Sequence, residues 1–94
     1  MIQRIVKMHF LPERIQEFQE IFKASNQRIR NFPGCKSLTL LRDIHNESIF
    51  FTLSIWENEM ALETYRASVL FNETWANTKK LFAKKAEAWS TQIF

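Results

Sequence analysis

The chain has 94 residues, a length typical of one domain, so the sequence predicts a single domain over residues 1–94. A hydrophobic content of 46%, with nine Phe and three Trp, excludes a disordered chain, and the only glycine, Gly34, excludes the glycine-rich phosphate loops of nucleotide-binding folds. The net charge of +3 comes from charges scattered along the chain, so we expect no nucleic-acid partner.

A single cysteine, Cys35, cannot form a disulfide within the chain, and no Cys and His residues have the spacing of a zinc site. This cysteine usage fits a reducing, cytoplasmic location. Arg4, Lys7 and His9 interrupt the apolar start of the chain, so it does not resemble a signal peptide. No apolar run is long enough to cross a bilayer, and we therefore expect no membrane partner.

The first part of the chain is predicted to form a strand and then a helix. Apolar and polar residues alternate imperfectly over Ile2–Phe10, as in a strand. Pro12 is tolerated in a first helical turn, and apolar residues then recur at steps of three and four, which predicts an amphipathic helix. This stripe consists of Ile15, Phe18, Phe22, Ile29 and Phe32, with the small residue Ser25 at one of its positions. The pair Pro33-Gly34 predicts where the helix ends.

The middle of the chain is predicted to form a β-hairpin. Residues 36–43 and 49–57 are rich in Leu, Ile, Phe and Thr, which favour strands. The connection between them, residues 45–48, is short and polar. Two such strands joined by a short polar segment are typical of a hairpin.

A helical region and a last strand follow. Asn58 is suited to capping a helix, and a roughly helical apolar spacing continues as far as Phe82. Ser68 predicts a break inside this region and the start of a second helical segment. A weaker extended pattern over residues 87–94 predicts the final strand.

The predicted order is strand, helix, strand, strand, helix, strand, which is the ferredoxin-like βαββαβ arrangement of the α+β class, with a four-stranded antiparallel sheet and helices on one face. The third strand is apolar on both sides, with Ile49, Phe51, Leu53 and Ile55 on one and Phe50 and Trp56 on the other. An uncovered apolar face is unfavourable in water. We therefore predict a homodimer in which two chains pack these faces together.

One side of the third strand carries two aromatic rings and two small hydroxyl residues, in the order Phe50, Thr52, Ser54, Trp56. Small residues leave room for a largely apolar cavity beneath the helices, which is how small-molecule sites are usually built. The helix residues expected to face this cavity are Phe18, Phe22, Tyr65, Phe71 and Trp75. Ordinary aromatic core packing explains the same pattern, so both interpretations stay open.

Three segments resemble one known family: Asn31–Cys35, Leu40–Asp43 and Trp56–Leu62, the last followed by Tyr65. They are similar to the antibiotic biosynthesis monooxygenase (ABM) domain, and the similarity spans nearly the whole chain. The resemblance implies a dimeric α+β barrel. It also implies that some relatives oxygenate quinol-like or polycyclic aromatic substrates with O₂ and without metal or flavin, and that others degrade haem.

The resemblance assigns candidate catalytic roles to three residues. Trp56 matches the family tryptophan after the third strand, and Thr52 stands where oxygenating relatives have an Asn that orients a substrate oxygen. Tyr65 stands where many relatives have a His, and a phenol is a poor base at neutral pH but a useful hydrogen-bond donor. Candidate substrate-binding residues are Ser54, Phe22, Phe71, Trp75 and His9. Arg66, next to Tyr65, could supply positive charge to the cavity if it turned inward, but it is expected at the surface, near Glu63 or Glu73.

Two classes of function follow. The first is a cofactor-independent monooxygenase that uses O₂ on a small quinol-like or hydroxylated aromatic molecule, with no metal or other cofactor. The second is a non-catalytic, dimeric domain that binds a small ligand or is purely structural, which the lack of an evident general base favours. Haem degradation is a weaker alternative, because residues 58–85 contain no histidine to bind the iron.

Overall fold

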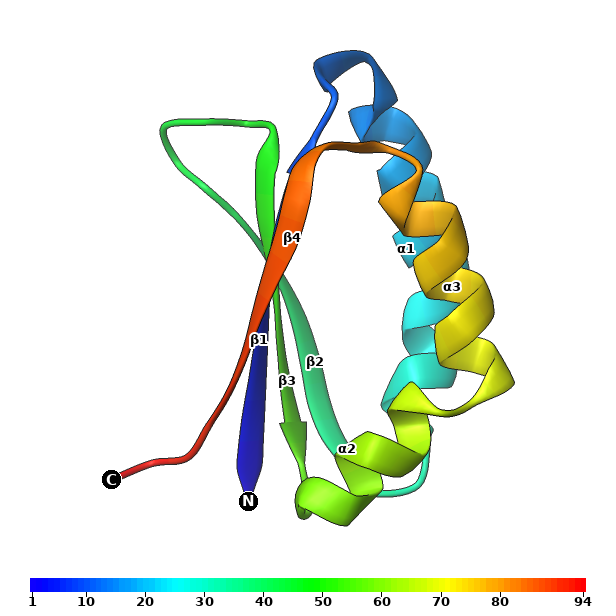
Figure 1. Cartoon of the computed structure of the whole chain (residues 1–94), viewed down its shortest axis with the longest axis vertical. Coiled ribbons are helices and arrows are strands. Elements are labelled where there is room, and N and C mark those ends of the chain that lie inside the picture. Colours follow the sequence, from blue (N-terminus) through cyan, green and yellow to red (C-terminus); the bar gives the residue numbers. More distant parts are fainter.

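The computed structural model describes residues 1–94 and shows a sheet covered by helices on one face only (Figure 1). The elements are β1 (Ile2–Phe10), the short 3-10 helix η1 (Pro12–Arg14), α1 (Ile15–Arg30), β2 (Cys35–Arg42), β3 (Ile49–Trp56), α2 (Glu59–Arg66), α3 (Val69–Lys79) and β4 (Phe82–Thr91). This order confirms the predicted ferredoxin-like α+β fold. No helix has the length and apolar character required to cross a membrane.

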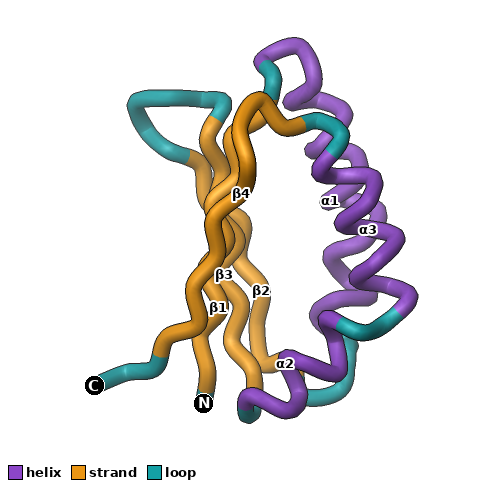
Figure 2. The backbone as a smooth tube through the Cα atoms, viewed as in Figure 1, coloured by secondary structure: helices purple, strands orange, loops and turns teal.

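The four strands form an antiparallel sheet in the order β2-β3-β1-β4, and α1 and α3 lie across one face of it (Figure 2). The register of β1 decides which side chains share a face. Val6 lies opposite Thr52 on β3 and Ala88 on β4, so these three point to the helices. Because side chains alternate along a strand, the odd-numbered residues of β1 point to the other face.

The turn between α1 and β2 contains the one residue with a left-handed backbone. Gly34 has φ +87°, and a Cβ built on it would lie 2.5 Å from the Cβ of Ala61 on α2. Its carbonyl also accepts a hydrogen bond from the backbone N–H of Glu57. The sequence correctly predicted that the helix ends before this turn, but α1 ends at Arg30, so Phe32 of the predicted stripe lies in the turn. The close approach to Ala61 and the left-handed φ show why glycine is required at position 34.

The second helical region consists of two helices, as the predicted break implied. Asn58 caps α2 by accepting a hydrogen bond from the backbone N–H of Ala61 at 2.8 Å. Ser68 caps α3 in the same way, through the N–H of Phe71 at 3.1 Å. The prediction that helical spacing continues to Phe82 was wrong, because α3 ends at Lys79 and Phe82 begins β4.

The last strand also differs from its prediction, since β4 spans Phe82–Thr91 and not residues 87–94. It is an edge strand, and its pairing with β1 shifts register near Lys84. Edge position and the irregular register break the alternation that sequence reasoning relies on. The last three residues, 92–94, have no strand partner.

A compact aromatic core fills the end of the molecule where η1 joins β1. The rings of Phe10 and Phe18 stack at a centroid distance of 4.2 Å, and Phe50 packs against both. Met8 and Leu81 complete this buried cluster. The packing holds α1 against the sheet, and Met8 and Phe18 of the cluster also border the cavity described below.

The face of the sheet away from the helices is uncovered in the single chain and carries several apolar side chains beside polar ones such as Lys7 and Glu87. The register aligns Ile5 with both Leu53 and Trp89, and Phe51 with Leu41. Leu41 and Trp89 keep 46% and 44% of their surface exposed. The outward positions of Phe51 and Leu53 agree with the two-sided apolar character predicted for the third strand.

Candidate functional site

A cavity of about 320 Å³ lies between the helix-facing side of the sheet and the helices. Its walls are mostly apolar, and its volume is in the range of small-molecule sites. The space exists because small side chains line it from both layers: Ser25, Thr52, Ser54, Thr74, Thr78, Ala86 and Ala88. Large residues at these positions would fill the space, so the cavity follows from the residue sizes on this face.

Trp56 is fully buried at the end of β3 and forms part of the cavity wall. Its indole Nε1–H donates a hydrogen bond to Ser54 Oγ at 2.9 Å. The indole N–H is therefore already bonded within the chain and is not free for a ligand. The Ser54 hydroxyl accepts this hydrogen bond and therefore keeps its own O–H as a donor. This O–H is the polar group that Trp56 and Ser54 together present to the cavity.

Tyr65 on α2 lies flat against Trp56, with ring centroids 4.8 Å apart. Phe32 and Phe71 pack edge-on against its ring. Burial, with a smaller contribution from nearby Cys35, raises the pKa of the Tyr65 phenol to about 12. The phenol is therefore protonated at neutral pH, and its hydroxyl, which has no hydrogen-bond partner in the chain, is a donor and not a base.

Thr52 lies in the middle of β3, and its side chain points into the cavity. Like Tyr65, it has a hydroxyl that forms no hydrogen bond within the chain. Two unpaired hydroxyls, from Thr52 and Tyr65, thus face one apolar space together with Ser54. Such a small set of donors on apolar walls can orient a ligand oxygen.

The remaining predicted substrate-binding residues divide into two groups. Phe22, Phe71 and Trp75 all line the cavity, and the rings of the last two are nearly parallel at 5.9 Å. His9 does not join them. It is an odd-numbered residue of β1 that pairs with Ile49 and points to the opposite face of the sheet.

No histidine lines the cavity, because His45 lies in the exposed turn between β2 and β3. The cavity therefore lacks the imidazole that would bind a haem iron. No three His, Cys, Asp or Glu side chains lie close enough together to hold a metal ion. Cys35 is partly buried, which raises the pKa of its thiol.

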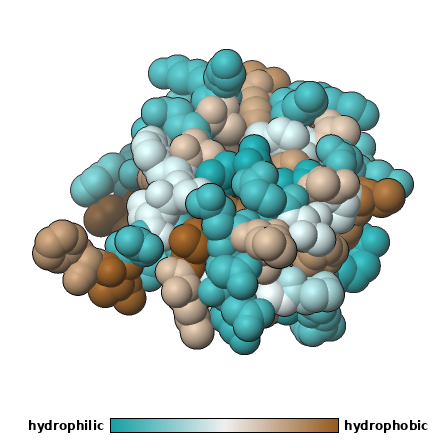
Figure 3. Space-filling model, turned by 60° about the horizontal axis from the view of Figure 1, so that its bottom comes forward, coloured by the Kyte–Doolittle hydropathy of each residue, from teal (hydrophilic) through white to brown (hydrophobic).

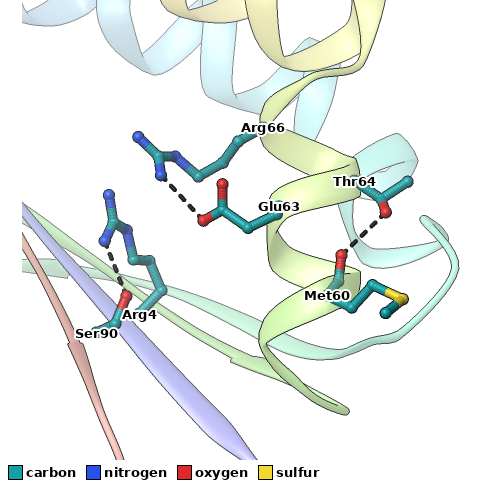
Figure 4. Close-up of polar contacts among 6 residues, drawn as sticks. All are labelled: Arg4, Met60, Glu63, Thr64, Arg66 and Ser90. Carbon is teal, nitrogen blue, oxygen red and sulfur yellow. Dashed lines mark hydrogen bonds and ion pairs between the residues drawn. The ribbon is translucent and has the colours of Figure 1, made fainter.

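Sequence reasoning missed one charged residue at the cavity, Arg4. Arg4 on β1 lines it and donates a hydrogen bond to Ser90 Oγ at 2.9 Å. Arg66 forms the expected ion pair with Glu63 at 3.1 Å, and it also lines the cavity (Figure 4). Arg4 and Val6 are both even-numbered residues of β1 and so point to the same face of the sheet. Strand alternation in the sequence could therefore have indicated that Arg4 faces the cavity.

Comparison with known proteins gives one family. The family model described as antibiotic biosynthesis monooxygenase (ABM) matches residues 1–77. No curated protein matches the chain.

Solved structures with the same fold share little sequence with this chain. A conserved protein from Methanosarcina mazei Go1 is 23% identical with a TM-score of 0.93, over 97% of this chain and 90% of that one. A structure named antibiotic biosynthesis monooxygenase is 17% identical with a TM-score of 0.94, over 100% and 99% of the two chains. A protein from Mycobacterium tuberculosis is 15% identical with a TM-score of 0.91, over 99% and 94%.

Proposed function

Because the chain belongs to the antibiotic biosynthesis monooxygenase family, we propose that it is a cofactor-independent monooxygenase of a small quinol-like or hydroxylated aromatic molecule. The observation that carries this proposal is the apolar cavity of about 320 Å³ with the unpaired hydroxyls of Thr52 and Tyr65 on its wall. The aromatic walls suit a flat ring, and the hydroxyls suit its oxygen substituent.

The reaction needs no electron donor other than the substrate. A phenol and O₂ give a quinone and one water, so one oxygen atom enters the ring, the other leaves in water, and the ring supplies all four electrons. The difficult step is the first electron transfer to O₂, which an ionised phenolate performs more readily than the neutral phenol. A site that excludes bulk water and holds the phenolate oxygen with fixed donors favours this step.

The residues have separate roles in this proposal. Tyr65 and Thr52 donate hydrogen bonds to the substrate oxygen. Trp56 holds Ser54 in place through its indole N–H and supports the Tyr65 ring by stacking on it. The apolar side chains of Phe71 and others keep water out.

The alternative is that the domain binds a small ligand without converting it. It is favoured by one observation: the cavity contains no side chain that acts as a base at neutral pH, since Tyr65 is protonated. In this case ligands would raise the melting temperature without any uptake of O₂.

We also propose that the chain forms a homodimer through the apolar outer face of the sheet. Leu41 and Trp89 expose nearly half of their surface there, and Ile5 and Phe51 lie between them. Covering these side chains with the same face of a second chain removes apolar surface from water. The cytoplasmic location remains a prediction from the cysteine usage.

The decisive experiment measures O₂ uptake with naphthols and anthrone as substrates, against autoxidation in buffer. With isotopically labelled O₂, a monooxygenase places one labelled atom in the quinone and one in water. We expect Tyr65→Phe to reduce the rate at least about tenfold, because it removes a hydrogen bond that the reacting oxygen would receive. The matched control is Thr64→Val, since the Thr64 side chain is exposed on the same helix and bonds only to Met60.

Two results would count against an enzyme. The first is uptake equal to autoxidation for every substrate, and the second is an unchanged rate in Tyr65→Phe. A rise in melting temperature with the same aromatic molecules, without O₂ uptake, would instead support the non-catalytic alternative.

A further inference from the structure

Two guanidinium groups lie together at one end of the cavity. Arg4 comes from β1 and Arg66 from α2, and both line the cavity. Figure 4 shows their side chains extending toward the same region, with Glu63 beside Arg66. This end of the molecule is brought forward in Figure 3, where hydrophilic and hydrophobic side chains are interspersed and the most strongly hydrophobic groups lie at the lower left and right.

The positive charge at this end is only partly neutralised. Arg66 pairs with Glu63 at 3.1 Å, whereas Arg4 has no acidic partner and bonds only to the neutral Ser90 hydroxyl. Two arginines and one carboxylate leave one uncompensated positive charge. Burial lowers the pKa of Arg4, and repulsion from Arg66 lowers it further, while Glu63 acts in the opposite direction.

A partly buried cation without an ion-pair partner is unfavourable, and a second cation nearby makes it more so. An anion between the two guanidinium groups would remove both penalties. Guanidinium is well suited to this because its planar N–H donors match the two oxygens of a carboxylate, and charge-assisted bonds to an anionic oxygen are stronger than neutral ones. Ser54 lies directly opposite Arg4 in the sheet and accepts the hydrogen bond from Trp56. The two arginines therefore lie next to the aromatic part of the cavity.

We infer that Arg4 and Arg66 form an anion-binding end of the cavity, which takes an anionic oxygen of an otherwise flat and apolar ligand. The oxygen belongs either to a carboxylate or to an ionised phenol. The inference rests on the proposed function only in that the cavity holds a ligand. It narrows the ligand class to aromatic molecules that bear a negative charge at one end.

The experiment compares two molecules that differ in charge and little in shape, naphthoate and the neutral naphthamide, by calorimetry at neutral pH. We expect naphthoate to bind at least about tenfold more tightly than naphthamide. A hydrogen bond to a charged group contributes more than about 1.4 kcal/mol, and 1.4 kcal/mol corresponds to a tenfold difference in affinity. Arg4→Gln should remove this preference and leave the affinity for naphthamide unchanged. Arg28→Gln is the control, because Arg28 is exposed on α1 and lies outside the cavity.

A second variant tests whether the affinity for naphthoate rises when a negative charge near the two arginines is removed. Glu63→Gln removes the carboxylate that competes for Arg66, so naphthoate should bind several-fold more tightly to it. This variant keeps the test valid if Arg4→Gln does not fold. A third measurement, the fluorescence titration of bound naphthol, separates the two oxygen sources: a lowered pKa of bound naphthol indicates a phenolate site, and an unchanged one restricts the site to carboxylates.

The outcomes separate this inference from the proposed function. Equal affinity for naphthoate and naphthamide, or no binding of either, would overturn it whatever the O₂ uptake. Weaker binding of naphthoate to Glu63→Gln would overturn it as well. A charge preference that Arg4→Gln removes, in a protein that consumes no O₂, would support the anion-binding end and contradict the monooxygenase.

Discussion

Raising the pH tests how far the environment of Tyr65 suppresses its ionisation. Burial raises the pKa of this phenol from 10.0 to about 12. Because the pKa of Tyr65 is about two units higher in the folded chain than in the unfolded one, ionising it costs the folded state about 2.7 kcal/mol of stability. Because the folded chain keeps the proton and the unfolded chain loses it first, this stabilisation is fully present below pH about 10 and is lost as the pH rises toward about 12.

The assay is a spectrophotometric titration of the phenolate, which is specific because Tyr65 is the only tyrosine in the chain. Tyr65→Phe supplies the blank for Trp and Cys absorption. Urea denaturation of both proteins at pH 10 and at pH 12 then gives the pH-dependent loss of unfolding free energy due to Tyr65 alone, which is about 2 kcal/mol between these two pH values. A phenolate signal with its midpoint near pH 10, while circular dichroism still shows the folded chain, would refute the reasoning, because burial would then leave the pKa of Tyr65 at its ordinary value.

Other substitutions test the fold and the site. Gly34→Ala should lower the free energy of unfolding by about 2 to 5 kcal/mol, from the left-handed φ and the contact with the Cβ of Ala61, and a change below about 0.5 kcal/mol in urea denaturation would contradict this. Asn58→Ala should lower it by about 1 kcal/mol through loss of the α2 cap, an effect that the same assay would detect. Thr52→Val should change stability by less than about 1 kcal/mol, because its hydroxyl is unpaired, yet reduce the rate of O₂ uptake; an unaltered rate would remove Thr52 from the site. Phe51→Lys should convert the proposed homodimer to a monomer in sedimentation experiments, and an unchanged dimer would place the interface elsewhere.

Local patterns were enough to predict most of the elements. The first strand, the hairpin and the break at Ser68 depend on residues close together in the sequence, through alternation, turn chemistry and helix capping. The same holds for Gly34, whose turn was predicted from two adjacent residues. The fold and the family could therefore be predicted before any coordinates, and both are confirmed.

The bounds of the final strand could not be predicted in the same way, because its apolar and polar residues do not alternate regularly. Lys84 lies at an irregular point of the register, and β4 pairs with β1 on one side only. Phe82 belongs to a strand because it pairs with Phe10 of β1, which comes from a distant part of the chain.

The candidate site shows the same division. The sequence alone determined which rings and hydroxyls would be available, and alternation along β3 correctly placed Thr52 and Ser54 on the helix-facing side. Only the tertiary structure decided that a cavity remains between the layers, that the Trp56 N–H is already bonded, and that Arg4 approaches Arg66. The reason is physical: periodicity reports the face on which a side chain lies, whereas empty space and the meeting of two charges depend on the distance between elements that only packing sets.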